Sequence, residues 1–364
     1  MINRILVYLG RHIDSFLLAA LSALLVVGLI TLYSASSESF VRVAGQVRNI
    51  GVAVAVMWII AMLPPQIIQR MALPIYTFSL VALVGVALFG EVTNGARRWL
   101  DLGVARFQPS EFMKLGVPLA LAWYFDRYEA ILKMRDFAIA AAMMLVPVLL
   151  VARQPDLGTA LLIAAAGFYV IFLAGLSWKI LVALFLAGAG ALPLLWSVMH
   201  DYQRQRVLTL LDPTQDPLGA GYHTIQAAIA LGSGGFFGKG WLNGTQAHLD
   251  FLPERSTDFI FAVFSEEFGL FGNIILMTLF LIVIGRGFYI ASNASTLFTR
   301  LIAGTLTMTF FTYVVVNVGM VSGILPVVGV PLPLISFAGS SLLTVFAGMG
   351  ILMNIQTHKR LVKS

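Results

Sequence analysis

The sequence predicts an all-α, polytopic membrane protein of about ten transmembrane helices. Of its 364 residues, 59% are hydrophobic and only 11% are charged, and the mean hydropathy is +0.91. No water-soluble fold can bury that much apolar surface, so lipid is the expected solvent. The first apolar stretch, residues 15–37, is uncharged and long enough to span a bilayer.

Apolar runs predict the individual spans, because a bilayer-crossing helix needs about 20 apolar residues. Seven runs are residues 15–36, 49–63, 71–90, 111–125, 137–152, 157–178 and 180–199. An eighth span begins at Asp258 and continues to about Gly285, interrupted by Glu266 and Glu267. The uncharged stretch 301–358 is too long for one helix, and the Pro- and Gly-rich run 323–333 is expected to divide it into two.

An even number of spans places both termini on the same side of the membrane. The segments on that side carry more Lys and Arg than the short loops on the other side, so both termini are predicted to be cytoplasmic. This orientation exposes residues 91–110 and a long outer loop, residues 200–257, between helices seven and eight. We interpret residues 1–364 as one transmembrane domain with this loop as its elaboration.

Composition also excludes several classes of function. The chain has no cysteine, so disulfides and thiolate metal sites are absent. Its net charge of +6 is spread over many loops without a polybasic run, which argues against nucleic acid as a partner. His200, His223 and His248 lack the spacing of metal ligands and are expected to be surface or hydrogen-bonding residues.

Three predicted helices begin alike on the outer side, with a Pro and a carboxylate in or just before the first turn. The carboxylates are Glu111, Asp156 and Asp258. One explanation is helix initiation, because Pro suits the first turn and carboxylates satisfy free N–H groups there. The alternative is that three such starts at one membrane face converge on a shared site.

Asp258 differs from the other two carboxylates because it lies where a long polar loop meets the apolar run that starts at Phe259. Partial desolvation there raises its pKa, while a helix N-terminus and Arg255 lower it. A general base at neutral pH needs such a balance. A simple capping role remains the alternative.

Glu266 and Glu267 follow Asp258 in the same predicted helix. At helical rise they would lie about 12–14 Å deeper, and at about 100° per residue Glu267 faces away from Asp258. A carboxylate dyad is therefore not expected. Buried ionisable groups usually pair inside the bundle, so we expect a structural role, with a proton path as the alternative.

Basic residues near the outer face could bind an anion. Arg97 and Arg98 could clamp a phosphate, whereas Trp99 beside them could be an interfacial anchor. Glu111 and Lys114 share one helix face and could neutralise each other. The run 232–240 resembles a phosphate loop only superficially, because Gly240 stands where Ser or Thr is needed, so no NTP site is expected. Lys239 in this run could still lie near an anionic ligand.

Long literal motifs in this chain resemble the SEDS family of FtsW, RodA and SpoVE proteins. They are Gly95-Ala-Arg-Arg-Trp99-Leu-Asp-Leu-Gly103, Phe107-Gln-Pro-Ser-Glu111, Gln154-Pro-Asp-Leu-Gly-Thr159, Asp212-Pro-Thr-Gln-Asp-Pro-Leu-Gly-Ala-Gly-Tyr222, Leu252-Pro-Glu-Arg-Ser-Thr-Asp258-Phe and the stretch from Asn317 to Ser336. The chain looks most similar to the elongation branch, the RodA type, rather than the division branch. It departs at Ser336-Phe-Ala338-Gly-Ser, where the family usually has Ser-Tyr-Gly-Gly-Ser.

The resemblance implies a peptidoglycan glycosyltransferase of the bacterial cytoplasmic (inner) membrane, which polymerises lipid II on the outer face. It implies as partners a class B penicillin-binding protein, the transpeptidase, and other membrane proteins of the elongation complex. The family's essential Asp corresponds to Asp258, its Trp to Trp99, and its cavity Glu and Lys to Glu111 and Lys114. We expect Asp156, Glu266, Glu267 and Asn317 to be buried polar residues with structural roles.

The mechanism expected from this resemblance makes Asp258 the general base for the 4-hydroxyl of the acceptor sugar. Positive charge must then stabilise the departing undecaprenyl pyrophosphate. The candidate cations are Arg97, Arg98, Lys114, Lys239 and Arg255. A divalent cation, Mg or Mn, could share this role, although no dedicated binding motif is visible.

Two other functions compete with catalysis. A flippase for lipid II is compatible with a bundle that contains buried carboxylates, but the polar residues gather at the outer end and the inner halves of most spans lack a hydrophilic path. A non-catalytic scaffold that recruits the transpeptidase would tolerate replacement of Asp258. Both stay alternatives to a glycosyltransferase.

Overall fold

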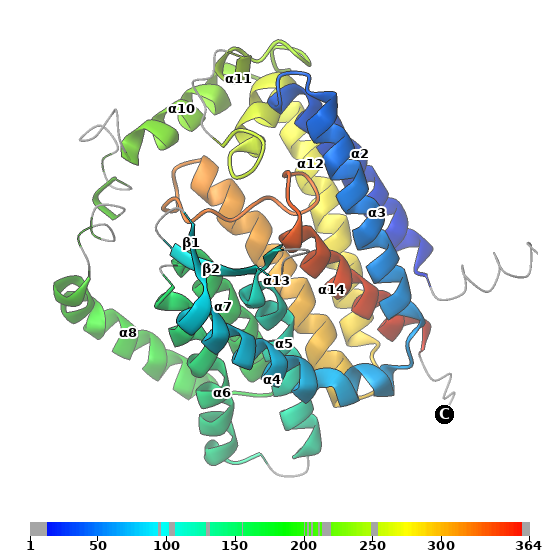
Figure 1. Cartoon of the computed structure of the whole chain (residues 1–364), viewed down its shortest axis with the longest axis vertical. Helices are drawn as coiled ribbons and strands as arrows, with labels where there is room; N and C mark the ends of the chain where they lie inside the picture. The colour runs from blue at the N-terminus through cyan, green and yellow to red at the C-terminus, as the bar shows by residue number, and fades with distance from the viewer. Residues whose placement is uncertain are drawn as a thin grey trace, which may run out of the picture.

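The computed structural model is a bundle of long helices with a loop region at one end (Figure 1). It describes residues 13–93, 96–101, 106–128, 132–154, 156–199, 201, 204, 207–209, 212, 220–248 and 254–358. We call the end that carries the segment after α8 the loop end, and the end where the described chain begins and finishes the terminal end.

Ten helices of 17 to 33 residues form the bundle within the described ranges. They are α2 (Ser15–Ala35), α3 (Phe40–Met62), α4 (Pro65–Phe89), α5 (Pro109–Arg127), α6 (Met134–Ala152), α7 (Leu157–Leu173), α8 (Trp178–Val198), α12 (Ile260–Ser292), α13 (Leu297–Val321) and α14 (Ser340–Thr357). Seven of them, all except α5, α7 and α8, are long and apolar enough to cross a membrane. The α7 helix and the apolar part of α8, Trp178–Leu194, are apolar but shorter than these seven spans. The chain is a multi-pass membrane protein, as predicted.

The helix boundaries differ from the predicted spans mainly where charged residues enter a helix. The second helix, α3, begins at Phe40 rather than residue 49, so Arg42 and Arg48 lie within it and not in an outer loop. Ser39 supplies the N-cap. Likewise α4 begins at Pro65, six residues before the predicted span. Hydropathy locates the apolar part of a helix, whereas caps determine its first residue.

The predicted division of the uncharged C-terminal stretch is confirmed. The α13 helix ends at Val321 and α14 begins at Ser340. Gly323 and Gly329 adopt positive φ angles of 73° in the connection, a conformation that favours glycine. The connection therefore crosses the loop end of the bundle between two helices.

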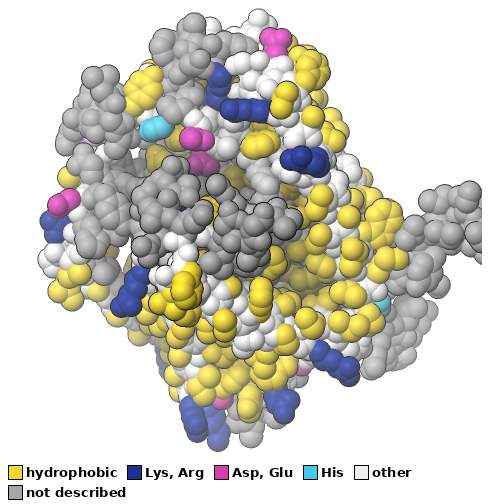
Figure 2. Space-filling view, viewed as in Figure 1, with side chains coloured by type: hydrophobic (Ala, Val, Ile, Leu, Met, Phe, Trp, Pro, Cys, Tyr) yellow, Lys and Arg dark blue, Asp and Glu magenta, His cyan; other side chains and the backbone are white. Residues whose placement is uncertain are grey.

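The helices pack around α13, which contacts α5, α7, α12 and α14. Farther out, α14 packs on α3, α12 on α2, α4 on α5 and α6 on α7. The α8 helix stands apart on one side of the bundle (Figure 1), and shares no extended packing interface with another described element. Figure 2 shows hydrophobic side chains over much of the described flank, with Lys and Arg side chains toward both ends.

The segment between α4 and α5 departs from the all-helical expectation. It forms three short strands, β1 (Glu91–Thr93), β2 (Ala96–Asp101) and β3 (Arg106–Phe107). Both pairings are antiparallel, in the order β1-β2-β3. The long loop also contains helical pieces, α10 (Ala220–Ser233) and α11 (Thr245–His248). These elements lie at the loop end of the helices (Figure 1).

The α12 helix is broken at Gly269, whose backbone has φ 64° and ψ −162°. The break separates the carbonyls of Glu266 and Glu267 from the N–H groups of Leu270 and Phe271, their helical partners four residues on. All four groups instead bond a segment of the long loop, residues 233–246, which we call the glycine-rich clasp.

Each of these four backbone bonds between the clasp and α12 is 3.0 Å long. The N–H groups of Lys239 and Gly240 donate to the carbonyls of Glu266 and Glu267, and those of Leu270 and Phe271 donate to the carbonyls of Gly235 and Phe236, respectively. Unpaired backbone groups are costly away from water, and the clasp satisfies them. The glycine-rich clasp therefore supplies the hydrogen bonds that the broken helix lacks. Its superficial likeness to a phosphate loop does not suggest this role.

Glu266 and Glu267 lie in the helical stretch before the break, and Glu267 is level with the loop end of α2. Ser34, next to the last residue of α2 at the loop end, donates a hydrogen bond to the Glu267 carboxylate. At the terminal end, Arg286 of α12 forms an ion pair of 2.5 Å with Asp14, the N-cap of α2. The spanning part of α12 is thus the stretch after Gly269, and residues 260–268 precede it at the loop end.

Candidate active site

A polar cavity of about 470 Å³ opens at the loop end of the bundle. It lies between the first turns of α5, α7 and α14, the Asp258 turn and the α13–α14 connection. Its size is that of a small-molecule site. The described lining contains three carboxylates and two cations, Glu111, Asp156, Asp258, Arg98 and Lys114.

The three carboxylates that follow the repeated Pro motif therefore share one site. Glu111 is in the first turn of α5, Asp156 is the N-cap of α7, and Asp258 precedes α12. Asp156 also caps its helix, because it accepts a hydrogen bond of 3.2 Å from the N–H of Thr159. Asp156 therefore caps α7 and also lines the shared cavity.

The backbone around Asp258 is held by the end of α13 and by the α13–α14 connection. The Asn317 amide donates to the carbonyls of Asp258 at 2.8 Å and Val330 at 2.7 Å. The Ser336 hydroxyl donates to the Thr257 carbonyl at 2.6 Å. Asn317 and Ser336 are almost completely buried. These bonds fix the backbone of the turn and leave the Asp258 side chain in the cavity lining.

Burial raises the pKa of the Asp258 carboxyl to about 6, and the negative charge of Glu254 contributes to the increase. Both causes disfavour the ionised form. Arg255, which we expected to lower the pKa of Asp258, is not among the residues that shift it. The Arg255 guanidinium donates to the Ser37 hydroxyl at 2.8 Å, and Arg255 is not part of the cavity lining. Asp258 is thus ionised at neutral pH while remaining basic enough to accept a proton.

Glu111 and Lys114 form a buried pair at the side of the cavity, as their spacing predicts. Their carboxylate and ammonium are 2.7 Å apart, with side-chain exposures of 7% and 6%. Thr344 of α14 donates to the second Glu111 oxygen at 3.1 Å. The Lys114 ammonium also lies 5.5 Å from the ring centroid of Tyr313, a cation–π distance. One positive charge is therefore held at the cavity wall.

A second cation reaches the cavity from the small sheet. Arg98 lies in β2, and its Nε is 3.7 Å from a carboxylate oxygen of Asp156. The Arg98 side chain remains 38% exposed. Trp99 is partly buried and is not in the cavity lining, and nothing is described of the Arg97 side chain. Of the Arg97, Arg98 and Trp99 side chains, the structure describes the last two, and Arg98 is the one that lines the cavity.

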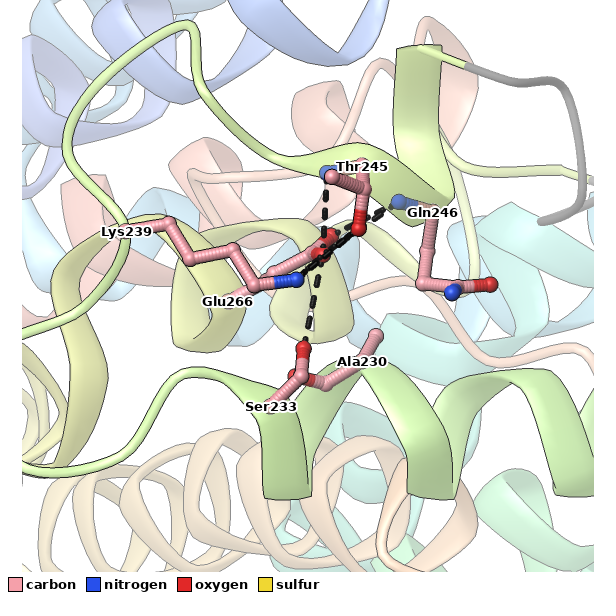
Figure 3. A network of polar contacts seen from close by, with 6 residues as sticks. All are labelled: Ala230, Ser233, Lys239, Thr245, Gln246 and Glu266. Atoms are coloured by element: carbon pink, nitrogen blue, oxygen red, sulfur yellow. Dashed lines mark hydrogen bonds and ion pairs between the residues drawn. The ribbon is translucent and has the colours of Figure 1, made fainter.

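Lys239 is also outside the cavity lining. Its ammonium pairs with the buried Glu266 carboxylate at 2.7 Å and donates to the Thr245 hydroxyl at 2.8 Å. The N–H groups of Thr245 and Gln246 also point to Glu266 (Figure 3), at 2.9 Å and 3.2 Å. Lys239 therefore stabilises the clasp, and it is not among the residues that line the cavity.

Several cavity residues were missed by sequence reasoning. Gln108 precedes the Pro of the α5 start, and Ser340 and Ser341 begin α14. Gln108 lies inside a quoted motif and could have been found there. The serines lie in an uncharged run with no local signal. Thr344 and Tyr313, which contact the Glu111–Lys114 pair, are apparent only from helix packing.

The histidines do not build a metal site in the described part of the chain. No cluster of three or more His, Asp or Glu residues that could hold a metal ion is found there. His223 stacks on Phe259, with ring centroids 5.7 Å apart, and burial lowers its pKa. His200 lies outside the described residues, as does the side chain of His248.

Comparison with known proteins identifies the family. The FtsW/RodA/SpoVE model of cell cycle proteins matches residues 14–361. The peptidoglycan glycosyltransferase MrdB of Escherichia coli strain K12 is 49% identical over 352 residues, 96% of this chain and 95% of the relative. The peptidoglycan glycosyltransferase RodA of Treponema pallidum is 31% identical, with 95% of this chain and 98% of the relative covered.

Solved structures agree with the sequence matches. A chain from a peptidoglycan synthase complex, studied for its coordination of polymerization and crosslinking, has a TM-score of 0.84 and 32% identity, with 96% of this chain and 99% of that chain covered. The rod shape determining protein RodA of Thermus thermophilus has a TM-score of 0.73 and 31% identity, with coverage of 96% and 98%. The chain belongs to the FtsW/RodA/SpoVE family of cell cycle proteins.

Proposed function

We propose that this protein is a peptidoglycan glycosyltransferase that polymerises lipid II into glycan strands during cell elongation. The relatives named as peptidoglycan glycosyltransferases cover almost the whole chain, which supports this activity. The observation that carries the proposal is the position of Asp258. Its carboxyl lines a polar cavity and has a pKa of about 6.

Asp258 acts as the general base in this proposal. It takes the proton from the 4-hydroxyl of the acceptor sugar as that oxygen forms a bond to C1 of the donor sugar. The bond between C1 and the pyrophosphate oxygen breaks, and undecaprenyl pyrophosphate leaves. A base on one side and cations on the other suit a displacement that inverts C1.

Arg98 and Lys114 are the cations of the described cavity lining that can stabilise the leaving pyrophosphate. Arg98 reaches the cavity from a strand and is partly exposed, so it can approach a phosphate bidentately. Lys114 is buried and paired with Glu111, and therefore acts as a fixed charge at the wall. Fixed cations near a developing negative charge lower the barrier without reorganisation.

The proposed location is the bacterial cytoplasmic membrane, with the cavity facing outward. The segments on the terminal side carry more Lys and Arg than the short loops on the other side, and basic residues favour the cytoplasmic side. The proposed partner is a class B penicillin-binding protein that crosslinks the strands. The likeness to a chain of a complex that coordinates polymerization and crosslinking supports such a partner. Other elongation-complex proteins would assemble around this pair.

The direct test is polymerisation of lipid II by the purified protein in detergent, with product length analysed by gel electrophoresis. Asp258→Asn should bind lipid II and elute as the wild type does, but should lose detectable polymer. Asp201→Asn is the matched control, because the Asp201 side chain is fully exposed in the long loop, and it should retain activity. Normal strands from Asp258→Asn would disprove the role of base.

A further inference from the structure

The glycine-rich clasp presents three large aromatic side chains to its surroundings. Phe236, Phe237 and Trp241 are 54%, 77% and 45% exposed, and we call them the aromatic tip. The rings of Phe236 and Phe237 contact each other, with centroids 4.8 Å apart. Apolar patches of this kind on a loop usually mark a contact with protein or lipid.

The aromatic tip is held against two membrane-spanning helices. The backbone of Gly235 and Phe236 accepts hydrogen bonds from Leu270 and Phe271 of α12. On the other side, the Trp241 indole donates to the Ile30 carbonyl of α2 at 3.2 Å. The α2 and α12 helices pack together (Figure 1). The position of the tip relative to the spans is therefore defined by direct bonds.

The depth of the tip can be counted from the terminal end of these helices, where Asp14 pairs with Arg286. Ile30 lies about 24 Å along α2 from Asp14, and Phe271 about 22 Å along α12 from Arg286, at 1.5 Å per residue. The hydrocarbon core of a bilayer is about 30 Å thick. The Phe237 ring centroid is 6.4 Å from that of Phe271, so with the Asp14–Arg286 pair at one edge of the hydrocarbon core the tip lies near the other edge.

The helix surfaces beside the tip are apolar and exposed. On α12, Leu270, Phe271 and Ile274 are 50%, 52% and 53% exposed, and on α2 Val26 and Ile30 are 55% and 41% exposed. Side chains of this kind on spanning helices face acyl chains. The tip extends the same surface, and Trp and Phe are suited to the boundary between acyl chains and headgroups.

We propose that the aromatic tip is inserted into the membrane, at the boundary of acyl chains and headgroups on the loop side. The glycine-rich clasp is then a membrane-anchored part of the long loop rather than a segment surrounded by water. Its glycines permit the close backbone approach to α12, and its aromatic side chains bind lipid. The proposal does not depend on the reaction that the cavity performs.

The absence of native cysteine allows a direct measurement. A nitroxide is attached at Phe237→Cys in the full-length protein in phospholipid nanodiscs, and collisions with oxygen and with a water-soluble nickel chelate are compared by electron paramagnetic resonance. Ile274→Cys on α12 is the lipid reference, and Asp201→Cys, at a fully exposed position of the long loop outside the clasp, is the water reference. Phe236→Cys is a second tip position.

The ratio of oxygen to nickel collisions at residue 237 is expected to match that at residue 274 and to exceed that at residue 201 several-fold. A ratio equal to that at residue 201 would show that the tip is in water and overturn the proposal. Low collision rates with both reagents would show that protein, such as a second copy, covers the tip, and would also overturn it. Gel filtration checks that each labelled variant is folded.

Discussion

At the scale of single residues, hydrogen bonds hold the backbone around Asp258, whereas its carboxyl group lines the cavity. Asn317 binds the Asp258 carbonyl and Ser336 binds the carbonyl of Thr257. The side chain lines the cavity, where burial and Glu254 raise its pKa. A capping carboxylate would instead be stabilised as an anion by helix N–H groups, with a lowered pKa. The raised pKa therefore favours a base over a cap.

This pKa predicts the pH dependence of polymerisation. The base form of Asp258 is lost as pH falls through about 6, so kcat/KM should fall about tenfold per pH unit below that value and level off above it. The negative charge of Glu254 also raises this pKa. Glu254→Gln removes that charge and should therefore move the midpoint of the pH–rate profile to lower pH. Initial rates measured from pH 5 to 8 test both statements. A midpoint that stays in place or rises in Glu254→Gln would contradict the electrostatic explanation.

The buried Glu111–Lys114 pair predicts a stability effect. Either Glu111→Gln or Lys114→Met leaves one charge buried without its partner, which costs about 3–5 kcal/mol. The double variant removes both charges and should recover much of the loss. Thermal unfolding in detergent, followed by loss of the monodisperse gel-filtration peak, measures each Tm. Equal Tm values for the single variants and the wild type would show that water compensates the unpaired charge.

At the scale of elements, the break in α12 connects the long loop to a spanning helix. The clasp bonds four backbone groups that Gly269 leaves without helical partners, and Glu266 binds Lys239 and Thr245 beside them. A helix break at the membrane boundary is tolerated because the freed groups are satisfied by protein. The conformation of the clasp and that of the Asp258-bearing segment are therefore linked through one stretch of chain.

This linkage makes Gly269 sensitive to substitution. Its φ and ψ of 64° and −162° fall in a region that is essentially restricted to glycine, and a residue forced into it costs about 1–3 kcal/mol. Gly269→Ala should therefore lower the Tm. Gly285→Ala is the matched control, because Gly285 lies in the same helix and has open space around its Cα. It should keep or raise the Tm, since Ala favours helix. A Tm unchanged in Gly269→Ala would argue against the broken helix.

At the scale of the whole molecule, polarity is distributed unequally between the two ends. The loop end carries the cavity, the small sheet and the clasp, while the terminal end carries the Asp14–Arg286 ion pair. A polymerase that uses a lipid-linked sugar needs its cavity at the level of the headgroups. The first turns of α5, α7 and α14 place it at one end of the bundle.

Orientation can be tested with single cysteines in the cysteine-free chain. Asp201→Cys in the long loop should react with a membrane-impermeant maleimide added outside spheroplasts, because its side chain is fully exposed. Arg135→Cys, an exposed position at the terminal end, should react only after the membrane is permeabilised. Labelling is read by mass shift on a gel. The reverse pattern would place the cavity on the cytoplasmic side and contradict the proposed function.

The sequence by itself determined the membrane class, the approximate number of helices and the division of the last apolar stretch. Hydropathy and the positions of Pro and Gly depend on local composition, which is why these features could be predicted. The three Pro–carboxylate starts also indicated a shared site, because helices that begin at one membrane face bring their first turns to the same level. The resemblance added a reaction, which composition does not specify.

Only the tertiary structure decided which charges meet. Lys239 and Glu266 are 27 residues apart and form an ion pair, whereas Lys239 and Asp258, closer in sequence, do not share the cavity. Asn317 is bonded to the backbone of a residue 59 positions away. A helical wheel assumes an unbroken helix, so it could not predict the break at Gly269 or the backbone bonds that the clasp makes there. Long-range contacts depend on packing, and packing follows from the complete arrangement of helices rather than from any one segment.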